Sequence, residues 1–135
     1  MSARLGDDRF AVALGDAWVL NDPVVGQGAN LGSRTAFVLA DTILALPPDD
    51  ETFCRAAHAA MWDAARPVVD WTNAFLQPPP PHARELLYTA ARDQRVANTF
   101  IDDFNDPTAQ WDVLSTPQHT AAWPHRVRGD TGRAA

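Results

Sequence analysis

The chain has 135 residues, of which 46% are hydrophobic, and its formal net charge is −6. This size and composition suit one folded domain, whereas the negative charge argues against binding to nucleic acid or to an anionic membrane surface. No apolar run is long enough to span a membrane and no apolar signal core follows Met1, so a cytoplasmic location is expected. The single cysteine, Cys54, excludes an intrachain disulfide and a cysteine-based metal site.

The N-terminal region predicts one strand. Residues 1–8 show no periodicity and are expected to be loose, whereas residues 9–14 form an apolar extended run. No second strand pattern is evident, so this strand has no obvious partner within the chain. We expect it to complete a sheet of further polypeptide or to pair with another chain.

Two turn segments follow this strand and carry the most informative residues. Gly15 and Asp16 form the first, and residues 21–30 read Asn-Asp-Pro-Val-Val-Gly-Gln-Gly-Ala-Asn. Pro23 stiffens the second turn, and Gly26 and Gly28 lack a Cβ, so that the backbone can approach a ligand closely. The first N–H groups of the following helix have no intrahelical partner and lie at the positive end of the helix dipole, which favours negative charge on a bound group.

Helices are expected over most of the remaining chain. The first begins between Gly28 and Asn30, ends near residue 46 at a proline pair, and is apolar around most of its circumference, so we expect it to be buried. Asn30 is a candidate cap for this helix. The second is capped by Asp49 or Asp50 and follows apolar steps of three and four residues as far as Phe75, and Pro67 should kink this helix instead of ending it.

Proline punctuates the C-terminal half. The run of four prolines at 78–81 breaks the chain, and helices are expected over 82–93 and 95–104, either separate or as one bent helix. Residues 107–114 predict a short turn that buries Trp111, and the segment from Ser115 onward has no periodicity and predicts a mobile tail. The chain therefore divides into 1–46, 47–114 and 115–135. The expected fold class is mainly α, with a short N-terminal strand, a glycine-rich turn and three to four helices.

The histidines do not predict a metal site, because they are spread over different elements and no pair has ligand spacing on one helix face. No Ser/His/Asp or Cys/His arrangement for nucleophilic catalysis can be argued either. Trp62 and Trp71 on the second helix are expected to serve packing. The four histidines are His58, His82, His119 and His125.

The two turns together resemble the second flavin-binding motif of FAD-dependent aromatic and alkene monooxygenases. The shared pattern is Gly-Asp, followed by Asp-Pro-x-x-Gly-Gln-Gly-x-Asn over residues 22–30. Residues 70–82 and the later Phe-Asn-Asp-Pro at 104–107 narrow the resemblance to the two-component styrene/indole branch. The resemblance covers about residues 9–114 and implies a fragment of an α/β, Rossmann-like FAD-binding monooxygenase fold.

The resemblance implies a role for each residue of the motif. The carboxylate of Asp16 would accept a hydrogen bond from a ribityl hydroxyl of FAD, and Pro23 would form a wall beside the isoalloxazine ring. The backbone at the start of the helix would direct N–H groups to the pyrimidine edge of the flavin. No side chain is expected to be catalytic. The implied cofactor-binding residues are Gly15, Asp16, Pro23, Gly26, Gln27, Gly28, Ala29 and Asn30.

The implied reaction is epoxidation of a small aromatic alkene. A separate flavin reductase would supply reduced FAD, and the flavin C4a-hydroperoxide formed with oxygen would transfer one oxygen atom to the alkene. The chain lacks the Gly-x-Gly-x-x-Gly fingerprint of a dinucleotide-binding unit, since Leu31 stands where its third glycine would be. Alone it should be inactive, so an N-terminal monooxygenase chain is a candidate partner in a split enzyme.

An alternative function also stays open at this point. The chain could instead be a non-catalytic helical interaction module derived from such an enzyme, with a homodimer covering its strand. The sequence also departs from the broader family at Trp18-Val19-Leu20, where many relatives carry Ala-His, and at Ser33-Arg34-Thr35-Ala36, where many have an aspartate before the alanine. The second departure fits the styrene/indole branch. Trp18 would either narrow a substrate pocket or pack against a missing domain.

Overall fold

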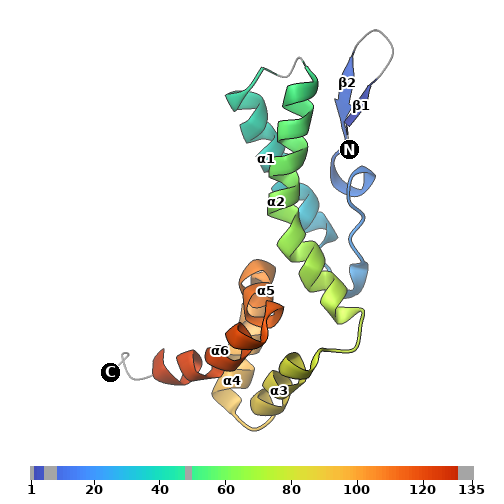
Figure 1. The fold of residues 1–135 in the computed structure, drawn as a ribbon. Coiled ribbons are helices and arrows are strands. Elements are labelled where there is room, and N and C mark those ends of the chain that lie inside the picture. The colour runs from blue at the N-terminus through green and yellow to red at the C-terminus, as the bar shows by residue number, and fades with distance from the viewer. Residues whose placement is uncertain (1, 5–8, 48–49, 131–135) are drawn as a thin grey trace. The chain divides into compact units, whose positions relative to one another are not determined.

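The computed structural model describes residues 2–4, 9–47 and 50–130, and most of them are helical (Figure 1). The chain divides after Thr72 into two compact units, Met1–Thr72 and Asn73–Ala135. The expected fold class is confirmed, although the described residues form six α-helices instead of three or four. This division does not coincide with the boundaries expected after residues 46 and 114. None of the described helices is both long enough and apolar enough to cross a membrane.

The N-terminal strand has a partner within the chain. Strands β1 (Ser2–Arg4) and β2 (Phe10–Val12) pair antiparallel, with Ser2 opposite Val12. The expectation of a loose N-terminus is therefore wrong for residues 2–4, and so is the expectation of an unpartnered strand. Residue 1 and residues 5–8 lie outside the described residues. A three-residue strand has too little pattern to be recognised from sequence, because its stability depends on its cross-strand neighbours.

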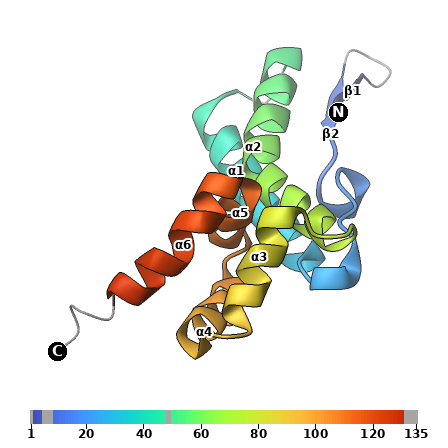
Figure 2. The same ribbon diagram turned by 60° about the horizontal axis from the view of Figure 1, so that its bottom comes forward.

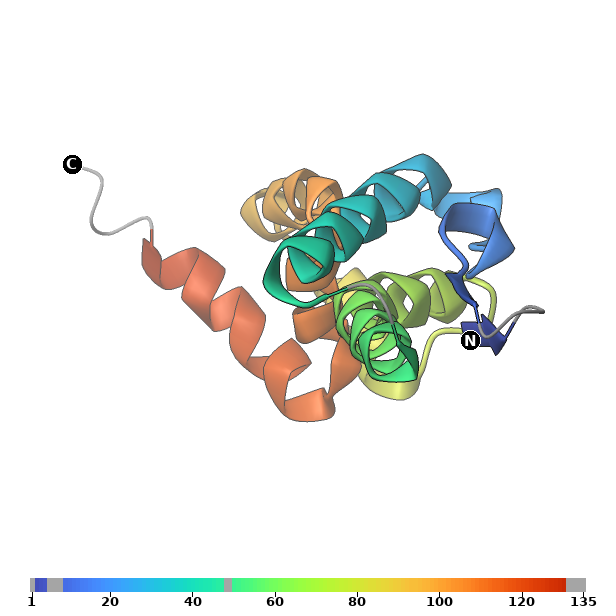
Figure 3. The same cartoon turned by 90° about the horizontal axis from the view of Figure 1, so that it is seen from above.

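Helices α1 (Gly28–Ala45) and α2 (Glu51–Phe75) form the body of the first unit and lie side by side (Figure 3). They run antiparallel, because Leu31 near the start of α1 packs with Ala65 and Val68, whereas Leu39 packs with residues near the start of α2. The carboxylate of Asp50 accepts the N–H of Phe53 at 2.8 Å, as the predicted cap requires. Helix α2 continues through Pro67, so the proline does not end the helix, as predicted.

Two expectations for α1 are wrong. Its N-cap is Gln27, which makes no capping side-chain bond, whereas Asn30 lies in the first turn and donates from Nδ2 to the Gln27 Oε1 at 3.0 Å. The helix is also not buried on most sides: Phe37 is 74% exposed and Leu44 is 86% exposed. The helix is apolar around most of its circumference, but only the face that carries Leu31 and Leu39 packs against α2.

The second unit is a cluster of four helices around one core (Figure 2). The core side chains come from all four helices, and the buried Gln110 joins two of these helices by donating from Nε2 to the Phe100 carbonyl at 2.8 Å. A second bond runs from Thr120 Oγ1 to the Val113 carbonyl at 2.7 Å. The helices are α3 (Pro81–Ala90), α4 (Gln94–Asp102), α5 (Pro107–Ser115) and α6 (Pro117–Asp130). The core residues are Leu86, Val96, Phe100, Val113 and Trp123.

Helix α6 replaces the mobile tail expected from Ser115, and residues 131–135 of that expectation lie outside the described residues. Tertiary packing supports α6, since Trp123 contacts Phe100 edge to face at a centroid distance of 6.2 Å. Helices α3 and α4 are separate, because Asp93 caps α4 through the N–H groups of Arg95 and Val96.

Candidate functional site

The first turn of the candidate site, Gly15–Ala17, leads out of the β-hairpin and packs against α1. Gly15 has φ +59°, a conformation that glycine adopts readily, and its carbonyl accepts the N–H groups of Trp18 and Val19, both at 2.9 Å. A Cβ built on Gly32 of α1 would lie 3.9 Å from the Gly15 Cα, so the turn and the helix are in close contact. The side chain of Asp16 is exposed on this turn.

The second turn, Pro23–Val25, leads directly into α1. The Asp22 carboxylate accepts the N–H of Val24 at 2.9 Å, and the N–H of Gly26 donates to the Pro23 carbonyl at 3.0 Å. Gly26 has φ +68°, a left-handed conformation that strains any residue with a Cβ. Pro23 and Val24 are both exposed, so they offer an apolar surface beside the start of the helix.

The start of α1 presents a row of backbone N–H groups. The first bond of its ladder runs from the Leu31 N–H to the Gln27 carbonyl at 2.9 Å, so the N–H groups of Gly28, Ala29 and Asn30 precede the ladder. A Cβ built on Gly26 or Gly28 would meet nothing within 4 Å, which means that this backbone faces open space. Donors at a helix N-terminus beside an exposed carboxylate suit a ligand that has both an electron-rich edge and hydroxyl groups.

The structure thus brings the two halves of the predicted site together. Gly15 and Asp16 lie on a turn packed against α1, and the other site residues form the turn and the first helical turn of the same helix. Their assignment to FAD stays a prediction.

Asn21 is a site residue that the sequence argument did not single out. It is 8% exposed, and its Nδ2 donates to the Thr72 Oγ1 of α2 at 3.1 Å. That hydroxyl in turn donates to the Val68 carbonyl at 2.9 Å. The bond holds the start of the Asp22–Gly26 turn to α2 across 51 positions of sequence. The side-chain amide of Asn21, directly before the Asp-Pro turn, is the one sequence feature that points to this role. The neighbouring residues do not identify Thr72 as its hydrogen-bond partner.

Trp18 packs within its own unit. Its ring contacts His58 edge to face at 5.7 Å and Trp62 at 6.3 Å between centroids, and it covers the cluster of Leu31, Ala65 and Val68. These contacts hold the segment between the two turns against α2. Trp71 is fully buried, in agreement with the packing role expected for it.

The perturbed carboxyl groups lie in the second unit, outside this site. Burial, reinforced by the charges of Asp102 and Asp106, raises the pKa of Asp103. The hydrogen bond from Arg128, at 2.9 Å, lowers the pKa of Asp93 together with its capping bonds. Neither group adjoins a candidate catalytic arrangement. Among the described residues, no group of three or more His, Cys, Asp or Glu side chains could hold a metal ion.

The two segments that narrowed the resemblance also meet in the structure. Phe75, from the 70–82 segment, and Phe104, from the Phe-Asn-Asp-Pro segment, contact edge to face with ring centroids 5.6 Å apart. Both residues lie in the second unit, so this contact is internal to it.

Comparison with known proteins agrees with the motif. No family profile matches the chain. Two curated proteins do match: styrene monooxygenase StyA of Pseudomonas fluorescens and styrene monooxygenase StyA of a Pseudomonas species, each 33% identical over 124 residues, or 90% of this chain. The chain is thus similar to styrene monooxygenases over most of its own length. It spans about 30% of the length of the two StyA proteins, so the similarity is to one part of them.

Proposed function

We propose that this chain is the FAD-contacting C-terminal part of a styrene/indole-type flavoprotein monooxygenase that acts in the cytoplasm. Further polypeptide would supply the dinucleotide-binding unit and the substrate region, and a separate flavin reductase would supply the cofactor in its reduced form. Reduced FAD would bring the oxygen-activating chemistry that converts a small aromatic alkene to an epoxide. The relationship to StyA over 90% of the chain supports this proposal.

The observation that carries the proposal is the contact between the Gly15–Ala17 turn and α1. Asp16 is exposed on that turn, and the first N–H groups of α1 precede its hydrogen-bond ladder. Asp16 would accept a hydrogen bond from a hydroxyl of the ribityl chain. The N–H groups of Gly28, Ala29 and Asn30 would donate to the electron-rich pyrimidine edge, where the helix dipole also stabilises negative charge.

The remaining residues would shape the surroundings of the ring. Pro23 and Val24 would exclude water from one side of the flavin, and Gly26 would let the backbone approach it. No side chain at this site acts as a general acid or base, so the chain contributes position and electrostatics. Removing one preorganised donor in other enzymes costs about 3–4 kcal/mol of transition-state stabilisation, which sets the scale for this helix start.

A second candidate is a non-catalytic interaction module derived from such an enzyme. The exposed Phe37 and Leu44 of α1 favour it, because they offer apolar surface for a homodimer or for another protein. Because β2 pairs with β1 within the chain, β2 does not require the sheet of another polypeptide as its partner. In this case the flavin motif would serve only to fold the turn.

The test is to purify the tagged chain under native conditions from its own cells and to record its mass and its visible spectrum. The proposal expects a complex much larger than the 14.7 kDa chain, with an oxidised-flavin spectrum and epoxidation of styrene when a flavin reductase is added. A colourless monomer or homodimer would overturn the proposal and support the interaction module.

A further inference from the structure

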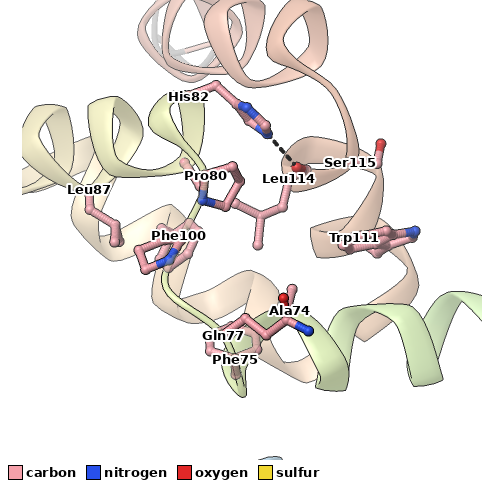
Figure 4. Close-up of a pocket in the computed structure, with 12 residues that line it drawn as sticks. Ala74, Phe75, Gln77, Pro80, His82, Leu87, Phe100, Trp111, Leu114 and Ser115 are labelled. Carbon is pink, nitrogen blue, oxygen red and sulfur yellow. Dashed lines mark hydrogen bonds between the residues drawn. The ribbon is translucent and has the colours of Figure 1, made fainter.

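The second unit contains an apolar cavity that the flavin motif does not use. Its volume is about 280 Å³, and it lies between the end of α2, the proline run and helices α3, α4 and α5 (Figure 4). All of its lining residues fall between positions 74 and 115 and therefore within one unit. Phe75, Phe100 and Trp111 bring aromatic rings to it from three different helices.

The lining carries no carboxylate, lysine or arginine. Its one ionisable side chain is His82, whose Nε2 donates to the Leu114 carbonyl at 3.0 Å, the bond drawn in Figure 4. The hydroxyl of Ser115 is likewise occupied, donating to the Asp112 carbonyl at 3.0 Å. Gln77 also lines the cavity, and its amide makes no hydrogen bond to any described residue, so it offers a ligand one polar contact.

Pro79 and Pro80 give the cavity a stiff wall. Proline has a fixed φ and no N–H group, so this stretch of backbone presents little polarity and loses little entropy when a ligand binds. The proline run thereby has a role beyond ending α2. Ala83 of α3 also lines the cavity and is nearly fully buried, whereas Leu87, one turn further along, is 44% exposed, so the cavity opens to solvent beside it.

We propose that this cavity binds a small, uncharged aromatic molecule of one or two rings. Apolar cavities of roughly 150 Å³ in other proteins stay dry and accept benzene, and drug-sized ligands fill roughly 300–1,000 Å³, so about 280 Å³ suits a molecule between these sizes. The rings of Phe75, Phe100 and Trp111 provide edge and face contacts for it. A charged ligand of the same shape is disfavoured, because the lining has no lysine, arginine or carboxylate to pair with its charge.

The test is titration of the full 135-residue chain with toluene and with benzoate, which have nearly the same shape. The readout is the NMR signal of the Trp111 indole N–H, identified by its loss in Trp111→Phe. We expect saturable shifts with toluene and none with benzoate. Equal responses to both probes, or no response to toluene, would overturn the proposal.

Two pairs of variants locate the site. Ala83→Leu fills the cavity and should weaken toluene binding by roughly tenfold or more, the scale of an added methylene group in a tight apolar pocket. Ala91→Leu, at the exposed end of α3, should leave binding unchanged.

Because Ala83 is buried and its variant could fail to fold, the second pair uses exposed positions. Leu87→Arg at the opening should weaken toluene and admit benzoate, whereas Tyr88→Arg, on the neighbouring exposed position, should do neither. Unchanged probe selectivity in Leu87→Arg would overturn the assignment to this cavity.

Discussion

Asn21 and Thr72 are joined by a buried hydrogen bond, from Nδ2 to Oγ1 at 3.1 Å, although 51 residues separate them in sequence. The bond fastens the beginning of the second turn to α2. Because α1 follows that turn directly, the same bond sets where the helix start and its N–H groups lie. The candidate site therefore depends on a helix that contributes none of its proposed ligand contacts.

Thr72→Val should destabilise the chain by about 1–3 kcal/mol, because the buried amide of Asn21 loses its acceptor while the side-chain volume is kept. The measurement is the free energy of unfolding in urea. Thr42→Val is the matched control, since the Thr42 hydroxyl donates only to the Val38 carbonyl of its own helix, at 2.8 Å. Its effect should stay within about 0.5 kcal/mol. Equal effects of the two substitutions would show that Asn21 is not anchored by Thr72.

Asp16→Ala should abolish flavin retention in the natively purified complex and leave the stability of the chain unchanged within about 0.5 kcal/mol. The Asp16 side chain is exposed and makes no hydrogen bond within the described chain, so it contributes little to folding. The flavin content is read from the visible spectrum of the purified complex. Asp41→Ala, which removes an exposed aspartate of α1, serves as control and should retain flavin. Retention of flavin by both variants would contradict the role proposed for Asp16.

Gly26→Ala and Gly28→Ala separate backbone strain from ligand approach. Gly26 has φ +68°, so an alanine there should cost about 1–2 kcal/mol of stability. Gly28 begins α1 with open space around its Cα, so an alanine there should be neutral or stabilising by up to about 1 kcal/mol. Thermal unfolding measures both. If the backbone of Gly28 approaches the flavin, Gly28→Ala should still reduce flavin content, a loss that stability cannot explain.

Asp93→Asn should reduce stability at neutral pH, because it removes the charge that pairs with Arg128 but keeps an oxygen for the α4 cap. Asp93→Ala removes both and should reduce it more. The pKa of Asp93 is lowered in the folded chain from its ordinary value of 3.8. The ionised carboxylate therefore stabilises the folded state at pH values above 3.8. The stabilisation should disappear as the pH falls below 3.8 through the lowered pKa. The melting temperatures of the wild type and of Asp93→Asn should therefore become equal at acidic pH. A difference in melting temperature that persists in acid would contradict a stabilising role of this ion pair.

Local patterns were sufficient for the two long helices. The Asp50 cap, the apolar steps of three and four residues and the prolines after Phe75 are all short-range signals, and α2 begins and ends where they indicate. The same holds for α1, whose first residue is Gly28 and whose last is Ala45. Its burial could not be predicted in the same way, because exposure depends on which surfaces of the rest of the chain reach the helix.

Helix α6 shows why local reasoning failed near the C-terminus. Residues 117–130 lack an apolar periodicity and contain Pro124, so propensity argues against a helix. The helix is stabilised instead by Trp123 in the core and by the bond from Thr120 to Val113, which come from contacts with other helices. Tertiary packing of this kind can stabilise a helix of weak helix propensity, and it cannot be predicted from the residues of the helix alone.

The features of the candidate site also fall into those that neighbouring residues predict and those that depend on tertiary contacts. Glycine and proline positions, the aspartates and the helix start can be read from neighbouring residues, because turns and caps are made of short-range hydrogen bonds. The contact of Gly15 with Gly32, the anchoring of Asn21 by Thr72 and the cavity beside Trp111 arise only when distant segments pack. The sequence alone therefore determined the turns, the caps and the helix start of the motif. Their positions relative to one another were decided by the tertiary structure, because close packing of side chains depends on residues far apart in the chain.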